Sequence, residues 1–164
     1  MAGFEYEQAQ RVAETFEKHG VRYLLIGKSG AIVLGYPDTT QDVDVYVEKT
    51  PENGEALVEA LLELGFPLQQ REQDEIRRGK DFVQIRTGPF DIDLVFAPDG
   101  IEAFEDAFGR ASEIEGIHVC SIDDIIRSKE ASGRQKDRES LPRLRAFREW
   151  LSTQGRKDRS SSSE

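Results

Sequence analysis

The sequence is poor in the residues that build disulfides, zinc sites and membrane spans. Its 164 residues include one cysteine, Cys120, and two histidines, His19 and His118. One cysteine cannot close a disulfide within the chain, and isolated histidines lack the spacing of zinc ligands. No apolar run reaches the ~20 residues that a membrane span needs, and the opening MAGFEYEQAQ lacks a hydrophobic signal core. We therefore expect a soluble, cytoplasmic protein without a membrane partner.

Negative charge dominates the chain but is unevenly spread. The net charge is -10, with 32 Asp+Glu against 22 Lys+Arg. Long, non-specific nucleic-acid binding depends on neutralising many phosphates, so this balance argues against it. Residues 127–164 are the exception, since they hold 11 Lys+Arg and only 6 Asp+Glu. This basic segment is either a solvated helix without a ligand or a place where the phosphates of a nucleotide bind.

Hydrophobic periodicity predicts helices and strands over most of the chain. The expected helices cover 4–19, 31–35, 51–65, 101–108, 121–131 and 136–151, and Ser121 is the expected N-cap of the helix at 121–131. The expected strands cover 21–26, 42–48, 81–87 and 90–96, the last two as a hairpin around Gly88-Pro89, and the segment 111–119 is expected as a strand or as a hairpin around Glu115-Gly116. The polar stretch 66–80 is expected to contain a loop, and Pro142 leaves open whether the last helix begins at 136 or only at 142. Together these elements predict an α+β fold, a small mixed β-sheet with helices on one side. We expect a single domain over residues 1–153 and a disordered C-terminal tail at 154–164.

Two Asp-x-Asp strands carry the most informative side chains. Asp42 and Asp44 stand in DVDVYVE, and Asp91 and Asp93 stand in FDIDLVF. Residues two apart on a strand share a face, ~7 Å apart between Cα atoms. Carboxylates gathered on one face need a counter-charge, and Mg²⁺ bound by carboxylates and phosphate oxygens supplies one. If the two strands are neighbours, three or four carboxylates converge as in a two-metal site; the alternative is a solvent-facing acidic surface without a ligand.

The segment around the first Asp pair resembles a known family signature. IGKSGAIVLGYPDTTQDVDVYV is similar to the strand, hG[GS] turn, short helix and DxD strand of minimal nucleotidyltransferases in the polymerase-β-like superfamily, of the AbiEii/MNT toxin–antitoxin-like type. The matching positions are Gly27, Gly35-Tyr36-Pro37, Thr40, Asp42 and Asp44. The resemblance covers residues 21–148 and implies the polymerase-β-like nucleotidyltransferase fold. It also implies that Asp42, Asp44 and Asp93 are the catalytic, metal-binding residues.

The basic segment follows the same family pattern. DDIIRSKEASGRQKDRESLPRLR resembles a helix pair that contributes basic contacts to the nucleotide triphosphate in toxin-like members. The positions that match are Lys129, Arg134 and Lys136. Asp137 matches too, and we expect it to cap or fix the neighbouring basic side chains. The resemblance adds Gly27, Lys28 and Ser29, from the turn, to the nucleotide-binding residues.

Lys28 departs from the family pattern, in which this position is Gly or Ser. Either its charge replaces the hydroxyl contact to phosphate at a helix N-terminus, where anions are favoured, or it marks a changed substrate or weakened catalysis. The sequence leaves both interpretations open. GKS also resembles the end of a P-loop, but Arg22 stands where that motif requires Gly, which excludes it.

The resemblance implies an enzyme that moves a nucleoside monophosphate from an NTP to an acceptor hydroxyl and releases pyrophosphate. Two Mg²⁺ ions are the expected cofactors, with Mn²⁺ as an alternative. The acceptor stays open between RNA or tRNA, a partner protein and a small molecule, and so does the oligomeric state. The alternative function is a catalytically inactive nucleotide-binding or antitoxin-like partner module, and a third is a metal-independent interaction protein.

Overall fold

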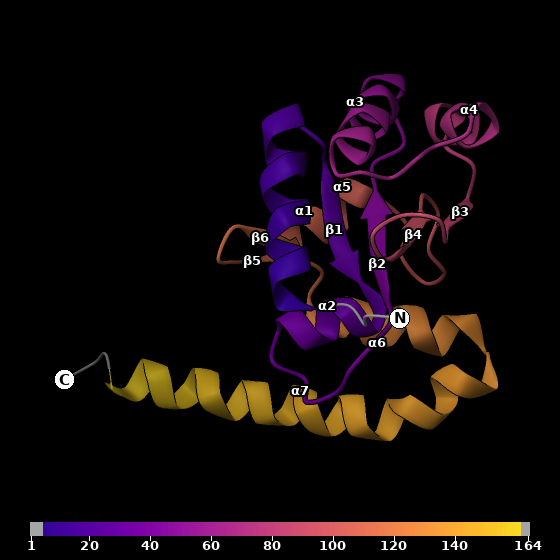
Figure 1. Ribbon diagram of the computed structural model, residues 1–164. Coiled ribbons are helices and arrows are strands. Elements are labelled where there is room, and N and C mark those ends of the chain that lie inside the picture. Colours follow the sequence, from indigo (N-terminus) through magenta and orange to yellow (C-terminus); the bar gives the residue numbers. More distant parts are fainter. Residues whose placement is uncertain (1–4, 162–164) are drawn as a thin grey trace.

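The computed structural model describes residues 5–161, with side chains described for residues 5–154. A six-stranded mixed sheet in the order β3-β4-β2-β1-β6-β5 forms its centre (Figure 1). The strands are β1 (Tyr23–Ile26), β2 (Asp42–Val47), β3 (Phe82–Ile85), β4 (Asp91–Val95), β5 (Ser112–Ile114) and β6 (Ile117–Val119). The helices are α1 (Tyr6–His19), α2 (Gly27–Val33), α3 (Pro51–Glu63), α4 (Gln70–Arg78), α5 (Phe104–Arg110), α6 (Ile122–Ser132) and α7 (Gln135–Ser161). Within the described residues, no helix combines the length and the apolar character that a membrane span requires.

The two strands that carry the Asp pairs lie side by side. β2 and β4 are parallel, and their register places Asp42 beside Asp91 and Asp44 beside Asp93. β3 runs antiparallel to β4, as expected for a hairpin around Gly88-Pro89. The neighbour relation on which the convergence of the carboxylates depends is therefore present.

Helices cover both faces of the sheet. On one face Phe16 of α1 and Leu57 of α3 pack with Val45 of β2 in one hydrophobic core. On the other, residues of α5, α6 and α7 pack with Leu24 and Tyr46 in a second core. Our expectation of helices on one side was wrong, because all four residues of β1 are buried and a strand buried on both faces needs cover on both.

The stretch 66–80 contains a helix where we expected a loop. In α4 only Ile76 is buried, so the segment shows almost no apolar periodicity. Its ends carry the missed signals: Gln69 and Glu72 form a capping box, and Gly79 ends the helix with a φ of 70°. Local capping, rather than a hydrophobic stripe, therefore marks this helix in the sequence.

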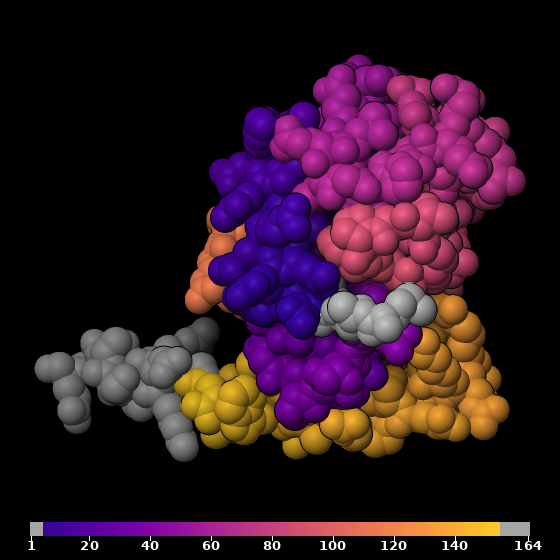
Figure 2. Space-filling model, viewed as in Figure 1, coloured from indigo at the N-terminus to yellow at the C-terminus, as the bar shows by residue number. Residues whose placement is uncertain are grey.

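The last helix begins at the earlier of the two expected positions and is longer than expected. α7 starts at Gln135 and contains Pro142. It continues through Ser161, past residue 153, where we expected the tail to begin; residues 162–164 lie outside the described part of the chain. Figure 1 shows α7 crossing the end of the molecule where α2 and α6 lie, and in Figure 2 the segment of α3 and α4 forms the opposite end.

Candidate active site

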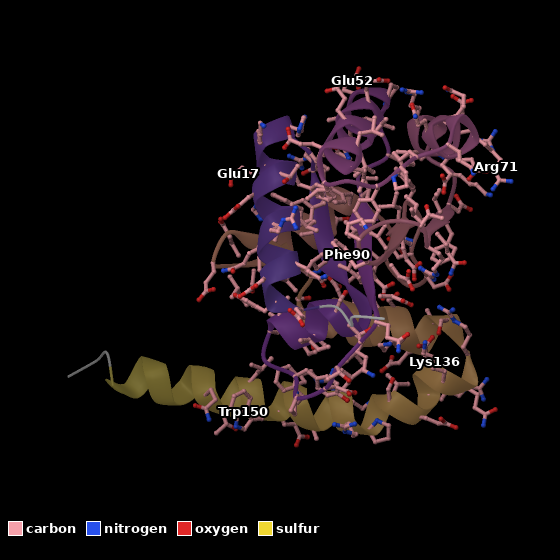
Figure 3. All side chains as sticks on the ribbon, viewed as in Figure 1. Glu17, Glu52, Arg71, Phe90, Lys136 and Trp150 are labelled. Carbon is pink, nitrogen blue, oxygen red and sulfur yellow. The ribbon has the colours of Figure 1, made fainter. Side chains whose placement is uncertain are left out.

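Four Asp side chains gather where β2 and β4 begin, at the end of the sheet near α2 and α6 (Figure 1). They are Asp42, Asp44, Asp91 and Asp93, which we call the aspartate quartet. Asp93 is 7% exposed and the other three are half-buried. Val43 and Val45 point the opposite way and are fully buried, so the alternation of β2 fixes which face carries the carboxylates. Phe90, which directly precedes β4, lies in the middle of the molecule in Figure 3.

The Asp44 carboxyl is the most perturbed member of the quartet. Burial raises its pKa to about 8, with further contributions from the adjacent Asp93 and from Asp42, while the charge of Lys129 acts in the opposite direction. Burial beside other carboxylates therefore favours the protonated form of Asp44 in the absence of a stronger counter-charge. A divalent cation is such a charge, because metal ligation requires the ionised carboxylate and displaces the proton.

Arg86 is a site residue that the sequence reasoning missed. Its Nη1 lies 2.9 Å from Asp93 Oδ1, its Nη2 3.8 Å from Asp42 Oδ2 and its Nε 4.0 Å from Asp91 Oδ2. Burial alone would lower the pKa of Arg86, but contact with Asp93 and the charges of Asp42 and Asp91 raise it instead. The alternation of β3, which exposes Phe82 and Gln84 and buries Val83 and Ile85, could have placed Arg86 on the face of the quartet.

The chemistry of the quartet fits a hard divalent cation, which prefers carboxylate oxygens. Asp93 Oδ1 is buried and accepts no hydrogen bond within the described residues, because Arg86 approaches it outside hydrogen-bonding geometry and the contact is an ion pair. As they are placed in the structure, no three or more His, Cys, Asp or Glu side chains between residues 5 and 154 have an arrangement that could hold a metal ion. In this conformation the guanidinium of Arg86 forms ion pairs with three of the four carboxylates.

Gly27 lies directly against Asp44. Its φ of 64° is in the left-handed region, and a Cβ at this position would clash with Asp44 Oδ2. The turn that we expected at Gly27 is the first turn of α2. A glycine is therefore required here both by the backbone and by the close approach of the carboxylate.

Ser29 links α2 to β2, the strand that carries Asp42 and Asp44, through hydrogen bonds. It is fully buried; its hydroxyl donates to Ile26 O at 3.0 Å and accepts from the Asp44 backbone N–H at 3.0 Å. These bonds join the start of α2 to β2 and hold the backbone of Asp44. In this structure the hydroxyl is thus engaged by the protein.

Lys28 points toward the loop between α2 and β2. Its Nζ lies 3.0 Å from Asp38 Oδ2, and Arg143 of α7 lies 3.7 Å from the same oxygen. The pKa of Asp38 is lowered mainly by a hydrogen bond from the Thr39 backbone N–H and, to a smaller extent, by Lys28. The structure therefore pairs Lys28 with a loop carboxylate outside the quartet.

Of the basic residues expected to bind nucleotide, Lys129 is the one whose charge lowers the pKa of Asp44. It is 15% exposed, and its Nζ lies 3.3 Å from Asp137. Arg134, which is exposed, reaches the same carboxylate at 3.2 Å. Burial would raise the pKa of Asp137, but the Ser132 hydroxyl and the two cations lower it. The expectation that Asp137 fixes neighbouring basic side chains is confirmed, while Lys136 is exposed near the start of α7 (Figure 3).

Comparison with known proteins identifies the fold. No family model matches the chain, and no curated protein matches it in sequence. Among solved structures, the lincosamide antibiotic adenylyltransferase LnuA bound to lincomycin is similar, with a TM-score of 0.60 and 13% identity over 88% of this chain and 98% of that one. A Thermotoga maritima protein with a provisional nucleotidyltransferase assignment has a TM-score of 0.56 and 14% identity over 92% and 97%. The predicted α+β, polymerase-β-like nucleotidyltransferase fold is confirmed.

Proposed function

We propose that this chain, which has the nucleotidyltransferase fold, transfers a nucleoside monophosphate from an NTP to an acceptor hydroxyl with the help of Mg²⁺. The observation that supports the proposal is the parallel register of β2 and β4, which sets Asp42 and Asp44 beside Asp91 and Asp93 on one face. Such a concentration of negative charge, with a raised pKa at Asp44, is typical of a functional site that receives a cation. We assign the activity to a single domain over residues 1–153.

Asp42, Asp44 and Asp93 are the proposed metal-binding residues. When bound, two Mg²⁺ ions, or Mn²⁺ in their place, activate the acceptor hydroxyl and stabilise the charge on the leaving pyrophosphate. The family resemblance also assigns Asp93 a part in removing the proton of the acceptor hydroxyl, and we propose that role for it here. Ser29 holds the Asp44 backbone, and Gly27 leaves the space that the Asp44 carboxylate occupies.

The nucleotide is proposed to bind between α2 and the start of α7. Lys129, whose charge acts on Asp44, is the proposed partner of a phosphate. The exposed Arg134 and Lys136 extend positive charge outward from it. Gly27, Lys28 and Ser29 complete the proposed binding segment, with Ser29 acting through its hold on β2.

The proposed acceptor is the hydroxyl of a small molecule. The similar LnuA structure is that of an antibiotic adenylyltransferase, and the likeness covers 98% of that chain. The net charge of -10 also disfavours a large RNA. RNA, tRNA and a partner protein are the other acceptor classes to be tested.

One alternative has an observation in its favour. Arg86 already places a positive charge on three of the four carboxylates, and Lys28 replaces the Gly or Ser of the family pattern. A catalytically inactive nucleotide-binding module would tolerate both features. It would bind nucleotide without transferring any part of it.

Ligand-dependent stability tests the proposed site. The unfolding midpoint is measured with Mg²⁺ alone, each NTP alone and both together, for wild type, Asp44→Asn and Asp123→Asn. We expect joint addition to stabilise wild type, since ligand at about 100 times Kd contributes about 2.7 kcal/mol. Asp123, an exposed residue paired with Arg148, is the matched control and should leave this shift intact. An unchanged shift in Asp44→Asn would place the ligand elsewhere and refute the site.

A further inference from the structure

The guanidinium of Arg86 lies where the aspartate quartet most needs positive charge. Its three nitrogens each face a different carboxylate, at 2.9 Å from Asp93, 3.8 Å from Asp42 and 4.0 Å from Asp91. The planar, delocalised guanidinium, with several donors, can serve several carboxylates at once, which the compact ammonium of lysine does less well. Arg86 is therefore placed to neutralise the quartet as a unit.

The backbone that carries Arg86 is held in place, while its side chain reaches solvent. Arg86 directly follows β3, on the face of Gln84, which is the register partner of Asp93. The turn after it packs tightly, since a Cβ at Gly88 would clash with the Phe66 ring, and Phe66 packs edge-on against Phe90 at 5.2 Å. The Arg86 side chain itself is 40% exposed, so the guanidinium can leave the quartet without movement of the sheet.

The other cations near the site are held by carboxylates of their own. Lys129 is paired with the buried Asp137, and Lys28 is paired with Asp38. Within the described residues, Arg86 is thus the cation whose ion pairs are made with the quartet itself.

We propose that Arg86 is the counter-ion of the quartet before substrate binds, and that it makes metal binding depend on the nucleotide. The inference rests on the proposed function. A divalent cation and the guanidinium would compete for the same oxygens of Asp93 and Asp42. Two cations bound to the same carboxylates would also repel each other. Arg86 therefore has to leave the carboxylates when metal binds. The anionic oxygens of a triphosphate can then accept the charge-assisted hydrogen bonds of its guanidinium in place of the carboxylates. Arg86 is a positioning residue: it keeps metal alone out and admits metal together with nucleotide.

The test measures metal binding without nucleotide, a property that a merely structural role would not improve. Mn²⁺ is titrated into wild type, Arg86→Gln, Arg86→Lys and Arg145→Gln, and free Mn²⁺ is followed by electron paramagnetic resonance. Arg145 is the matched control, because its ion pair, at 3.0 Å, is made with Glu130 and not with a member of the quartet. Unfolding midpoints are then compared with Mg²⁺ alone and with Mg²⁺ plus an ATP analogue that carries a methylene bridge between its α and β phosphorus atoms.

We expect Arg86→Gln to bind Mn²⁺ about tenfold tighter than wild type, Arg86→Lys to lie between them, and Arg145→Gln to match wild type. Mg²⁺ alone should stabilise Arg86→Gln, whereas wild type should need metal and nucleotide together. Mn²⁺ binding by Arg86→Gln and Arg86→Lys that equals or falls below that of wild type would overturn the inference and leave the proposed function standing. If wild type gains no stability from metal with nucleotide, the proposed function fails, and the inference fails with it.

Discussion

Two groups of Asp side chains in this protein differ in how their charge is balanced. Asp124, on α6, is fully buried; Arg110 contacts it through two nitrogens, at 2.9 and 3.1 Å, and Arg127 through one at 2.9 Å. Two guanidiniums thus serve one carboxylate. In the aspartate quartet, the single guanidinium of Arg86 is shared among three carboxylates. Asp44 is the fourth, and burial, with the neighbouring Asp93, raises its pKa to about 8.

The difference separates a carboxylate whose charge the protein neutralises from carboxylates that we propose to bind metal. Both carboxylate oxygens of Asp124 already accept hydrogen bonds from arginine, so Asp124 does not need another cation to balance its charge. The quartet has more negative charge than the protein supplies cations to offset. We therefore expect changes at Asp124 to lower stability and changes in the quartet to abolish ligand binding and catalysis.

The largest expected effect is the loss of transfer in Asp44→Asn. Removing a proposed metal-binding carboxylate should lower the rate by about 10³-fold, comparable to the loss of a main electrostatic contact in other active sites. The rate is measured as pyrophosphate released from NTP in the presence of acceptor. Asp123→Asn should retain the wild-type rate, and an Asp44→Asn rate within a few fold of wild type would refute the role of Asp44.

Asp124→Asn should show the opposite pattern. Loss of the buried charge leaves Arg110 and Arg127 without their partner, and we expect the free energy of unfolding to fall by about 2–3 kcal/mol. The affinity for metal with nucleotide should stay at the wild-type value in the folded fraction. Chemical denaturation and a nucleotide titration measure the two quantities, and a loss of affinity without a loss of stability would contradict the comparison.

Stability without metal should depend on pH through Asp44. Its pKa is raised from 3.8 to about 8 on folding, so its contribution is fully present below about pH 4 and is lost as the pH rises toward 8. We expect the free energy of unfolding to fall over this range, because the folded state then has to hold the ionised Asp44 in a buried position beside Asp93 and Asp42. Unfolding of wild type and Asp44→Asn between pH 4 and pH 9 measures it, and Asn should be the more stable variant at the upper end. Parallel curves for the two proteins would show that Asp44 titrates normally.

Two glycines with similar φ values allow the effect of backbone strain to be measured apart from the effect of steric crowding against Asp44. Gly27 and Gly20 have φ values of 64° and 70°, but only at Gly27 would a Cβ meet Asp44, while at Gly20 it would meet nothing within 4 Å. Alanine at either position should cost about 1 kcal/mol of stability from the backbone. Gly27→Ala alone should also weaken binding of metal with nucleotide, measured by titration. Equal binding by the two variants would remove Gly27 from the site.

The smallest expected effect distinguishes the two lysines. Lys129 acts on Asp44, whereas Lys28 is half-exposed and paired with Asp38. We expect Lys129→Gln to raise the KM for NTP about tenfold and Lys28→Gln to change it less than about threefold. Steady-state kinetics with NTP varied would check this, and the reverse order would assign the phosphate contact to Lys28.

The parts of the fold that could be predicted from the sequence are those with a clear period. The alternation in DVDVYV fixes which side of β2 carries Asp42 and Asp44, and Ser121 caps α6 as expected by accepting from the Asp124 backbone N–H at 3.1 Å. α4 was missed because it buries only Ile76, so its existence depends on caps and on packing against α3 rather than on an apolar stripe.

Strand alternation predicts only that Asp91 and Asp93 share a face of their strand. The choice of Asp93 as the third carboxylate came from the family resemblance, and the structure sets Asp93 next to Asp44. Arg86 directly follows β3, whose pairing with β4 the hairpin predicts and whose alternation places Arg86 on the face of Asp93. The alternation does not say which groups a long side chain contacts on that face, so the ion pair between Arg86 and Asp93 was not predicted.

The most direct test of the central claim follows the two ends of a nucleotide. Wild type and Asp44→Asn are incubated with Mg²⁺ and with each NTP in turn, labelled with ³²P at either the α or the γ phosphate, in the presence of small hydroxyl compounds, RNA or lysate protein. We predict that wild type moves the α label to an acceptor and releases the γ label as pyrophosphate, and that Asp44→Asn does neither. An α label that stays on the nucleotide with every acceptor, although metal and nucleotide bind, would contradict the proposed transfer and favour the inactive binding module.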